Sequence, residues 1–76
     1  MNAVDTATVA AEARAFARES GTEVGTRGRL SVEVFADYFV AQPKRAREVA
    51  QSVGIEAGTR GRLGREKAEV IAAAIR

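Results

Sequence analysis

The stretch Gly-Thr-Arg-Gly-Arg-Leu occurs twice in this chain of 76 residues, at 25–30 and again at 58–63, a shift of 33 positions. A repeat of this length corresponds to one supersecondary unit, so it constrains the fold more than any other feature. Each copy is predicted to contain a helix, a glycine stop, a basic loop and a second helix. The same shift aligns further pairs: Ala13 with Ala46, Arg14 with Arg47, Ala17 with Ala50, Gly21 with Gly54, Glu23 with Glu56 and Glu33 with Glu66.

The first copy predicts a helix over residues 6–20, after a frayed terminus at 1–5. Asp5 or Thr6 would cap its start, and Gly21 would end it in the left-handed conformation. Val24 is the apolar residue of the following loop that could plug the core. The apolar stripe of this helix is predicted to consist of residues that recur at helical spacing: Val9, Ala13, Phe16 and Ala17.

A second helix is expected from a cap at Ser31 to about Ala41. Leu30 before the cap and Phe35 after it have the spacing of a hydrophobic staple, which fixes the direction in which a chain enters a helix. The buried side of this helix is predicted to consist of Val34, Phe35, Tyr38 and Phe39.

The second copy predicts helices over 43–53 and 64–76. Pro43 suits a first helical turn, and Gly54 ends the first of the two helices. The inward residues are predicted to be Ala46, Val49, Ala50 and Val53 in one helix, and Ala68, Ile71 and Ile75 in the other. Val70 and Ala74 widen the apolar face of the last helix, so we expect that extra face to pack against the first copy or a second chain.

The fold class predicted is therefore all-α, with four short helices in two helix–long loop–helix units at 6–42 and 43–76. Since the second unit contains no aromatic residue, we expect it to pack on the first. This arrangement is similar to the peripheral subunit-binding domain of 2-oxo-acid dehydrogenase complexes, which binds protein partners.

Composition argues against an enzyme. The chain has neither cysteine nor histidine, which removes thiolate metal sites, the commonest metal ligand and the commonest general base. Glu66 and Glu69 lie one helical turn apart, but solvated charge explains them better than acid–base catalysis. We expect no cofactor and no metal. No stretch approaches a membrane span or a secretion signal, so a cytoplasmic protein is expected.

Charge is placed unevenly along the chain. Residues 1–42 carry four bases and six acids, and residues 43–76 carry eight bases and four acids, so −2 and +4 sum to the net +2. The second half is therefore expected to meet a polyanion more strongly. Lys44, Arg45 and Arg47 lie together near a predicted helix N-terminus and are candidate phosphate contacts.

The Arg-Gly-Arg centre of each motif suits the minor groove of DNA. That groove is about 6 Å wide and admits an extended backbone, and glycine lets the backbone approach its floor. Guanidinium groups are attracted to narrow, A·T-rich grooves. The residues predicted to bind DNA are Arg27, Gly28 and Arg29 with Arg60, Gly61 and Arg62, and the hydroxyls of Thr26 and Thr59 are expected to bind phosphate. The alternative is a solvated basic turn, which the duplication makes less attractive.

Two segments, 13–38 and 44–71, resemble the C-terminal DNA-binding domain of the actinobacterial H-NS-like nucleoid-associated silencer family. Their sequences are ARAFARESGTEVGTRGRLSVEVFADY and, more loosely in its last helix, KRAREVAQSVGIEAGTRGRLGREKAEVI. The resemblance implies that the Arg-Gly-Arg loops enter the minor groove of A·T-rich DNA in an actinobacterial or phage protein that acts at the nucleoid in transcription regulation.

One departure is that the family's separate N-terminal dimerisation domain, which is rich in strands, has no counterpart in 76 residues. Two binding units in one chain could substitute for dimerisation by raising the effective concentration. The alternative function is a protein-interaction module that binds an acidic partner surface or antagonises a host silencer. The acidic balance of the first half and the wide apolar face of the last helix favour that alternative, in which the last helix could also form a homodimer.

Overall fold

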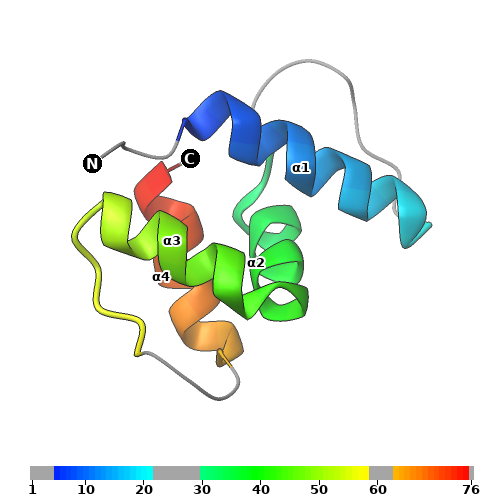
Figure 1. The fold of residues 1–76 in the computed structure, drawn as a ribbon. Helices are drawn as coiled ribbons and strands as arrows, with labels where there is room; N and C mark the ends of the chain where they lie inside the picture. The colour runs from blue at the N-terminus through cyan, green and yellow to red at the C-terminus, as the bar shows by residue number, and fades with distance from the viewer. Residues whose placement is uncertain (1–4, 22–29, 59–62, 76) are drawn as a thin grey trace.

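A computed structural model of the chain describes residues 5–21, 30–58 and 63–75. Within these ranges it contains four helices and no strand. The helices are α1 (Thr6–Glu19), α2 (Val32–Ala41), α3 (Pro43–Ser52) and α4 (Arg65–Ile75), as Figure 1 shows. The prediction of an all-α fold built from four short helices is confirmed. No helix in the described ranges is long and apolar enough to cross a membrane.

The helices begin and end where local chemistry predicts. Asp5 caps α1 by accepting a hydrogen bond from the Ala7 amide, and Ser31 caps α2 by accepting one from the Val34 amide at 3.2 Å. Gly21 and Gly54 follow the ends of α1 and α3 with φ angles of 83° and 79°. Only glycine adopts this left-handed conformation at little cost, so these two positions stop their helices.

The end of α3 forms a Schellman motif. The amide of Ile55 donates to the Ala50 carbonyl at 2.8 Å, and the amide of Gly54 donates to the Gln51 carbonyl at 3.3 Å. The turn places Ile55 against the core, whereas Val53, predicted to face inward, is 39% exposed. The prediction for Val53 was wrong because the helix ends one residue before it and the chain reverses at Gly54.

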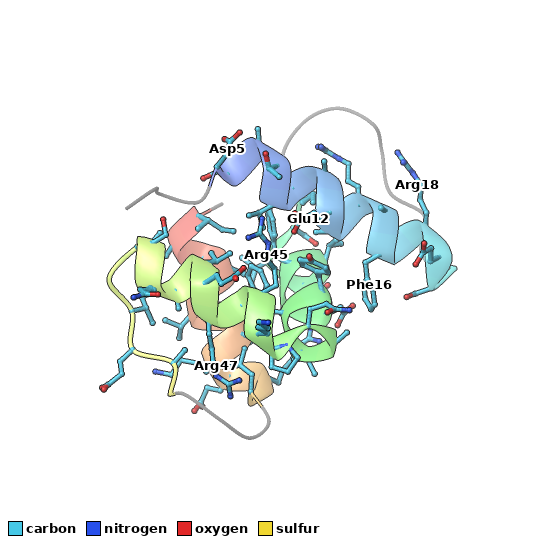
Figure 2. The ribbon with its side chains drawn as sticks, viewed as in Figure 1. Asp5, Glu12, Phe16, Arg18, Arg45 and Arg47 are labelled. Atoms are coloured by element: carbon cyan, nitrogen blue, oxygen red, sulfur yellow. The ribbon has the colours of Figure 1, made fainter. Side chains whose placement is uncertain are left out.

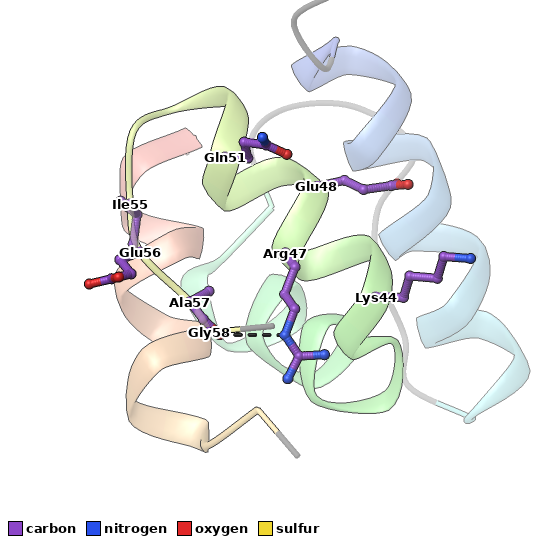
Figure 3. A pocket seen from close by; sticks show the side chains of 8 residues that line it. All are labelled: Lys44, Arg47, Glu48, Gln51, Ile55, Glu56, Ala57 and Gly58. Atoms are coloured by element: carbon purple, nitrogen blue, oxygen red, sulfur yellow. Dashed lines mark hydrogen bonds between the residues drawn. The ribbon is translucent and has the colours of Figure 1, made fainter. Parts of the chain in front are cut away.

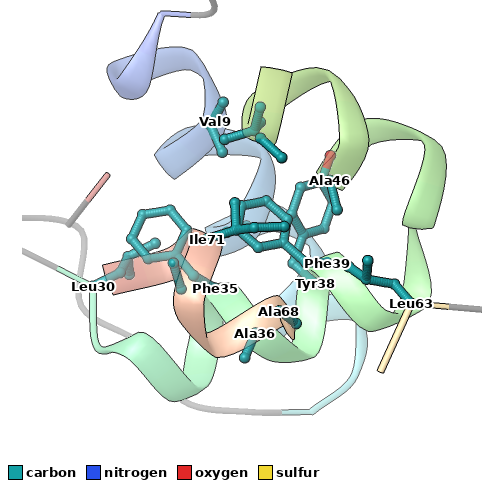
Figure 4. Packing of buried hydrophobic residues seen from close by; sticks show 14 residues of the cluster. Val9, Leu30, Phe35, Ala36, Tyr38, Phe39, Ala46, Leu63, Ala68 and Ile71 are labelled. Atoms are coloured by element: carbon teal, nitrogen blue, oxygen red, sulfur yellow. The ribbon is translucent and has the colours of Figure 1, made fainter. Parts of the chain in front are cut away.

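One apolar cluster is built from both halves of the chain (Figure 4). Its aromatic centre is on α2, where Phe35 stacks near Phe39 with ring centroids 6.1 Å apart and Tyr38 lies 5.8 Å from Phe39. Helix α4 makes the most extensive interhelical contact with α2 and adds Ala68, Ile71 and Ala72 to the cluster. The second half therefore shares the aromatic core of the first.

The exposed side of α4 differs from the prediction. Ile71 is fully buried and Ile75 is half-buried, as expected for the inner face. Val70 is 48% exposed and Ala74 is also exposed, so they do not pack against the first half. The reason is geometric, because α2 already covers the face of α4 that contains Ala68, Ile71 and Ala72. Contact with a second chain stays a prediction.

Candidate nucleic-acid interface

The two repeated motifs are held at their described ends by the same kind of residue. Leu30 closes the first motif and Leu63 closes the second, and each side chain is 6% exposed within the shared apolar cluster. Figure 4 shows the two leucines at opposite edges of that cluster. Gly58, the first residue of the second motif, has a φ of 75°. The described ends of both motifs are thus anchored in one shared apolar core.

The central residues of both motifs lie outside the described ranges. This applies to eight of the predicted DNA-binding residues: Thr26, Arg27, Gly28, Arg29, Thr59, Arg60, Gly61 and Arg62. Val24, predicted to plug the core, also lies outside them. The roles of these residues stay predictions from the sequence.

The three cations at the start of α3 have different surroundings. Lys44 is exposed, whereas Arg45 and Arg47 are half-buried. Successive helix positions are about 100° apart around the axis, so three neighbouring cations cannot all face one ligand. Sequence proximity alone grouped them as one phosphate-binding cluster, whereas in the structure Lys44 and Arg47 line one groove and Arg45 is paired with Glu12 on α1.

Arg45 joins α1 to α3. Its Nε donates to Glu12 Oε1 at 2.8 Å, its Nη2 donates to Glu12 Oε2 at 3.0 Å, and its Nη1 donates to Glu48 Oε1 at 3.0 Å. Figure 2 shows Glu12 and Arg45 side by side between the two helices. Bidentate arginine–carboxylate pairs are among the stronger charged hydrogen bonds. The guanidinium is therefore engaged within the protein, and its predicted phosphate contact stays untested.

Tyr38 completes this network from α2. Its hydroxyl donates to Glu12 Oε1 at 2.6 Å, so one carboxylate links three helices. The hydrogen bonds from Arg45, ahead of that from Tyr38, lower the pKa of Glu12 below its ordinary 4.5 despite partial burial. Burial, followed by the carboxylate of Glu12, raises the pKa of Tyr38 to about 12. Salt bridges to Glu12 and Glu48 raise the pKa of Arg45, so all three groups keep their ordinary charge near neutral pH.

Arg47 borders an open groove that leads to the second motif (Figure 3). The groove has a volume of about 720 Å³ and lies between α3 and the segment 55–58. Arg47 Nε donates to the carbonyl of Ala57, directly before the motif, at 3.4 Å. Lys44 also lines the groove, together with the apolar side chain of Ile55. The groove thus brings two cations and two acidic residues, Glu48 and Glu56, to Gly58, the first residue of the second motif.

A second ion-pair group ties α4 to α2. Arg65 Nη1 contacts Asp37 Oδ1, and Arg65 Nε donates to Glu69 Oε2 at 3.3 Å. The hydrogen bond to Asp37, followed by that to Glu69, raises the pKa of Arg65. Arg65 begins the helix that follows the second motif. This pairing helps to fix where that helix starts relative to α2.

Sequence reasoning missed both ion-pair groups. A signal for one of them was present, because Glu12 and Arg45 are 33 residues apart, the shift of the repeat, and carry opposite charges. No comparable periodicity marks Asp37 and Arg65. Among the described side chains no group of three or more acidic residues is placed to hold a metal ion.

Comparisons with protein-family models, with curated proteins and with solved structures returned no match to this chain. The interpretation of the site therefore depends on its own sequence and geometry.

Proposed function

We propose that this chain binds A·T-rich duplex DNA by inserting its two Arg-Gly-Arg motifs into the minor groove, as a nucleoid-associated or silencer-like regulator. The observation that carries the proposal is the duplication of Gly-Thr-Arg-Gly-Arg-Leu, with each terminal leucine buried in one common core. A basic turn that served only solubility would not need the same anchor twice. An anchored backbone also loses less conformational freedom when it binds a ligand.

The charge of the second half supports the same function. Lys44 is exposed and Arg47 borders the groove beside Gly58, so both cations are candidate phosphate contacts in this proposal, although Glu48 and Glu56 line the same groove. Phosphate contacts supply much of the affinity of DNA-binding proteins and make it fall steeply with salt. Arg45 has a different role in this proposal, because its guanidinium is paired with Glu12 and Glu48.

Gel-shift titrations would test the proposal with A·T-rich and G·C-rich duplexes of equal length at two salt concentrations. The wild-type chain should prefer the A·T duplex, lose affinity as salt rises, and be displaced by a small molecule that occupies the minor groove. Replacing all four motif arginines (Arg27, Arg29, Arg60 and Arg62) with alanine should weaken binding at least about tenfold, since a lost groove contact of this kind costs roughly 1–3 kcal/mol.

A charge-preserving control separates groove insertion from simple attraction to phosphate. Lysine at the same four positions keeps the net charge but lacks the planar, weakly hydrated guanidinium that suits a narrow groove. This variant should retain salt-dependent binding and lose most of the A·T preference. Unchanged affinity and preference in the alanine variant would refute the proposal.

A protein-interaction module is the second candidate, because α4 exposes Val70 on the side that does not face α2. In that function the chain would bind an acidic partner surface or a silencer protein. Equal binding to A·T and G·C duplexes, or none, would favour it. Replacing Val70 with aspartate should then abolish partner binding and leave DNA binding unchanged.

A further inference from the structure

Arg47, which borders the groove, has an equivalent in the first half of the chain. Under the repeat shift, residues 10–19 of α1 align with residues 43–52, which form α3. The identical aligned residues are Ala13 with Ala46, Ala17 with Ala50, and Arg14 with Arg47. The four alanines are buried in the core, which explains why both halves have them. The shared arginine needs another explanation, because the neighbouring Lys44 and Arg45 are not repeated and align with Ala11 and Glu12.

Both arginines are partly covered by the protein. Arg14 and Arg47 are half-buried, and the Nε atom of Arg14 is buried. A cation that serves only to attract phosphate gains from exposure, whereas a half-buried guanidinium needs hydrogen-bonding groups of its own chain. Arg47 has such a group, because its Nε donates to the carbonyl of Ala57 at 3.4 Å (Figure 3). This hydrogen bond is long, but its donor is charged.

The carbonyl held by Arg47 lies where the chain turns. The segment 55–58 begins with the Ile55 amide bonded to the Ala50 carbonyl at 2.8 Å, and Ile55 and Ala57 are partly buried against the core. The Ala57 carbonyl belongs to the peptide group that precedes Gly58, which has a φ of 75°. Glycine has the widest choice of backbone conformations, so fixing this peptide group restricts the chain where it is otherwise least restricted.

The other described end of the second motif is fixed by burial. Leu63 is 6% exposed in the shared apolar cluster. With Leu63 held by the core and the peptide group before Gly58 held by Arg47, both described ends are tied to the same helices. A segment that is tied at both ends has fewer conformations to lose when it binds a ligand.

We propose that Arg47 is a positioning residue for the second motif, which holds the Ala57 carbonyl and so sets the direction in which the chain enters the motif at Gly58. This inference rests on the proposed DNA-binding function and deepens it. Of the two candidate phosphate contacts at the groove, it leaves Lys44 in that role and gives Arg47 a different one.

Two variants of the full chain test this role through DNA binding. Arg47→Lys keeps the charge but places the Cε carbon where arginine has Nε, and Arg47→Gln removes the charge as well. Both should weaken binding to an A·T-rich duplex roughly fivefold, since about one residue of backbone must then be ordered on binding. The slope of log affinity against log salt should equal that of the wild-type chain. Lys44→Gln, at the same groove, is the matched control and should lower that slope by about 1.

A second measurement needs no DNA. Amide relaxation measured by NMR should give Gly58 of the wild-type chain a backbone order parameter near the rigid value of about 0.85, falling toward about 0.6 in Arg47→Lys and Arg47→Gln. Lys44→Gln should leave this order parameter unchanged, and Leu63 should keep its wild-type value in all variants. Circular dichroism with wild-type helix content shows that each variant is folded.

The outcomes separate this inference from the function on which it rests. Wild-type affinity in Arg47→Lys, or a lower salt slope in Arg47→Gln, would overturn the positioning role and leave DNA binding in place. Lower stability with unchanged affinity would show a purely structural role and would also overturn it. A wild-type chain that does not bind DNA would refute the proposed function, and the Gly58 order parameter would still decide whether Arg47 holds the segment. A value below about 0.6 in the wild-type chain would contradict the inference without any variant.

Discussion

Residue identity alone does not decide what the cations of this chain do. Lys44 and Arg45 are neighbours in sequence, yet Lys44 is exposed at the groove and Arg45 is paired with carboxylates on α1 and α3. Arginine is well suited to the second role because its planar group forms two parallel hydrogen bonds with one carboxylate. Arg45 donates two hydrogen bonds to Glu12, which comes from the other half of the chain. Arg45 is therefore a direct link between the halves.

Lys44→Gln should therefore affect mainly DNA binding, and Arg45→Gln should affect mainly the stability of the fold. Removing a phosphate contact weakens binding to all sequences and lowers the slope of log affinity against log salt by about 1. We expect this for Lys44→Gln, with little change in stability. Arg45→Gln should lower the unfolding free energy, and any loss of DNA binding should be recovered at lower temperature. Denaturant unfolding and gel shifts at several salt concentrations measure both. A salt slope that changes only for Arg45→Gln would contradict this assignment.

Glu12 should make the stability of the chain sensitive to acid. Its pKa is lowered in the folded state from 4.5, so the unfolded chain takes up the proton first as pH falls. The contribution of Glu12 is fully present above pH 4.5 and is lost as pH falls through the folded pKa. Glu12→Gln should cost about 1 kcal/mol at pH 7, a value discounted because the side chain is 33% exposed.

Urea unfolding at pH 7 and at pH 3 measures this effect. The difference in stability between wild type and Glu12→Gln should shrink at pH 3, because the wild-type carboxyl is then protonated more fully. Glu19→Gln, at an exposed position of the same helix, is the matched control and should track the wild type at both pH values. A constant difference between pH 7 and pH 3 would show that Glu12 acts through packing rather than charge.

At the scale of helices, the sequence predicted where each helix begins and ends better than it predicted which side chains pair between helices. Asp5, Ser31, Gly21 and Gly54 act within a few residues of themselves, so their effects can be inferred from local patterns. The pairing of Arg65 with Asp37 depends on how α4 packs against α2, which no local pattern encodes. The same limit explains why Val70 and Ala74 on α4 were predicted to be covered, whereas both are exposed. Roles of the Arg-Gly-Arg centres could be predicted only from motif chemistry and resemblance.

Replacing Gly54, which follows α3, should destabilise the fold more than replacing Gly64, which precedes α4. Its φ of 79° is left-handed, whereas Gly64 has no such conformation, and an added Cβ would meet no atom within 4 Å at either position. The pair therefore isolates backbone conformation from crowding. Gly54→Ala should cost about 1–2 kcal/mol of unfolding free energy, and Gly64→Ala only a few tenths. Chemical denaturation checks both, and equal losses would contradict a conformational origin.

At the scale of the molecule, the repeat folds as one unit because neither half encloses its own core. The aromatic side chains are on α1 and α2, and the side chains of α4 that cover α2 come from the other half. The two halves are therefore expected to unfold together, as small domains with one core commonly do. Such coupling would keep the two motif anchors, Leu30 and Leu63, at fixed positions relative to each other.

Ile71→Ala tests this coupling because Ile71 belongs to the second half and is fully buried in the shared cluster. Truncating such a side chain typically costs about 2–5 kcal/mol, through lost burial and the cavity left behind. Hydrogen exchange should then rise by a similar factor in α1, α2, α3 and α4, since opening one half opens both. Val70→Ala, at the exposed neighbouring position, should cost about 0.5 kcal/mol or less. Protection that falls only in α3 and α4 would show that the halves are independent, and the two anchors would then not be held at a fixed separation.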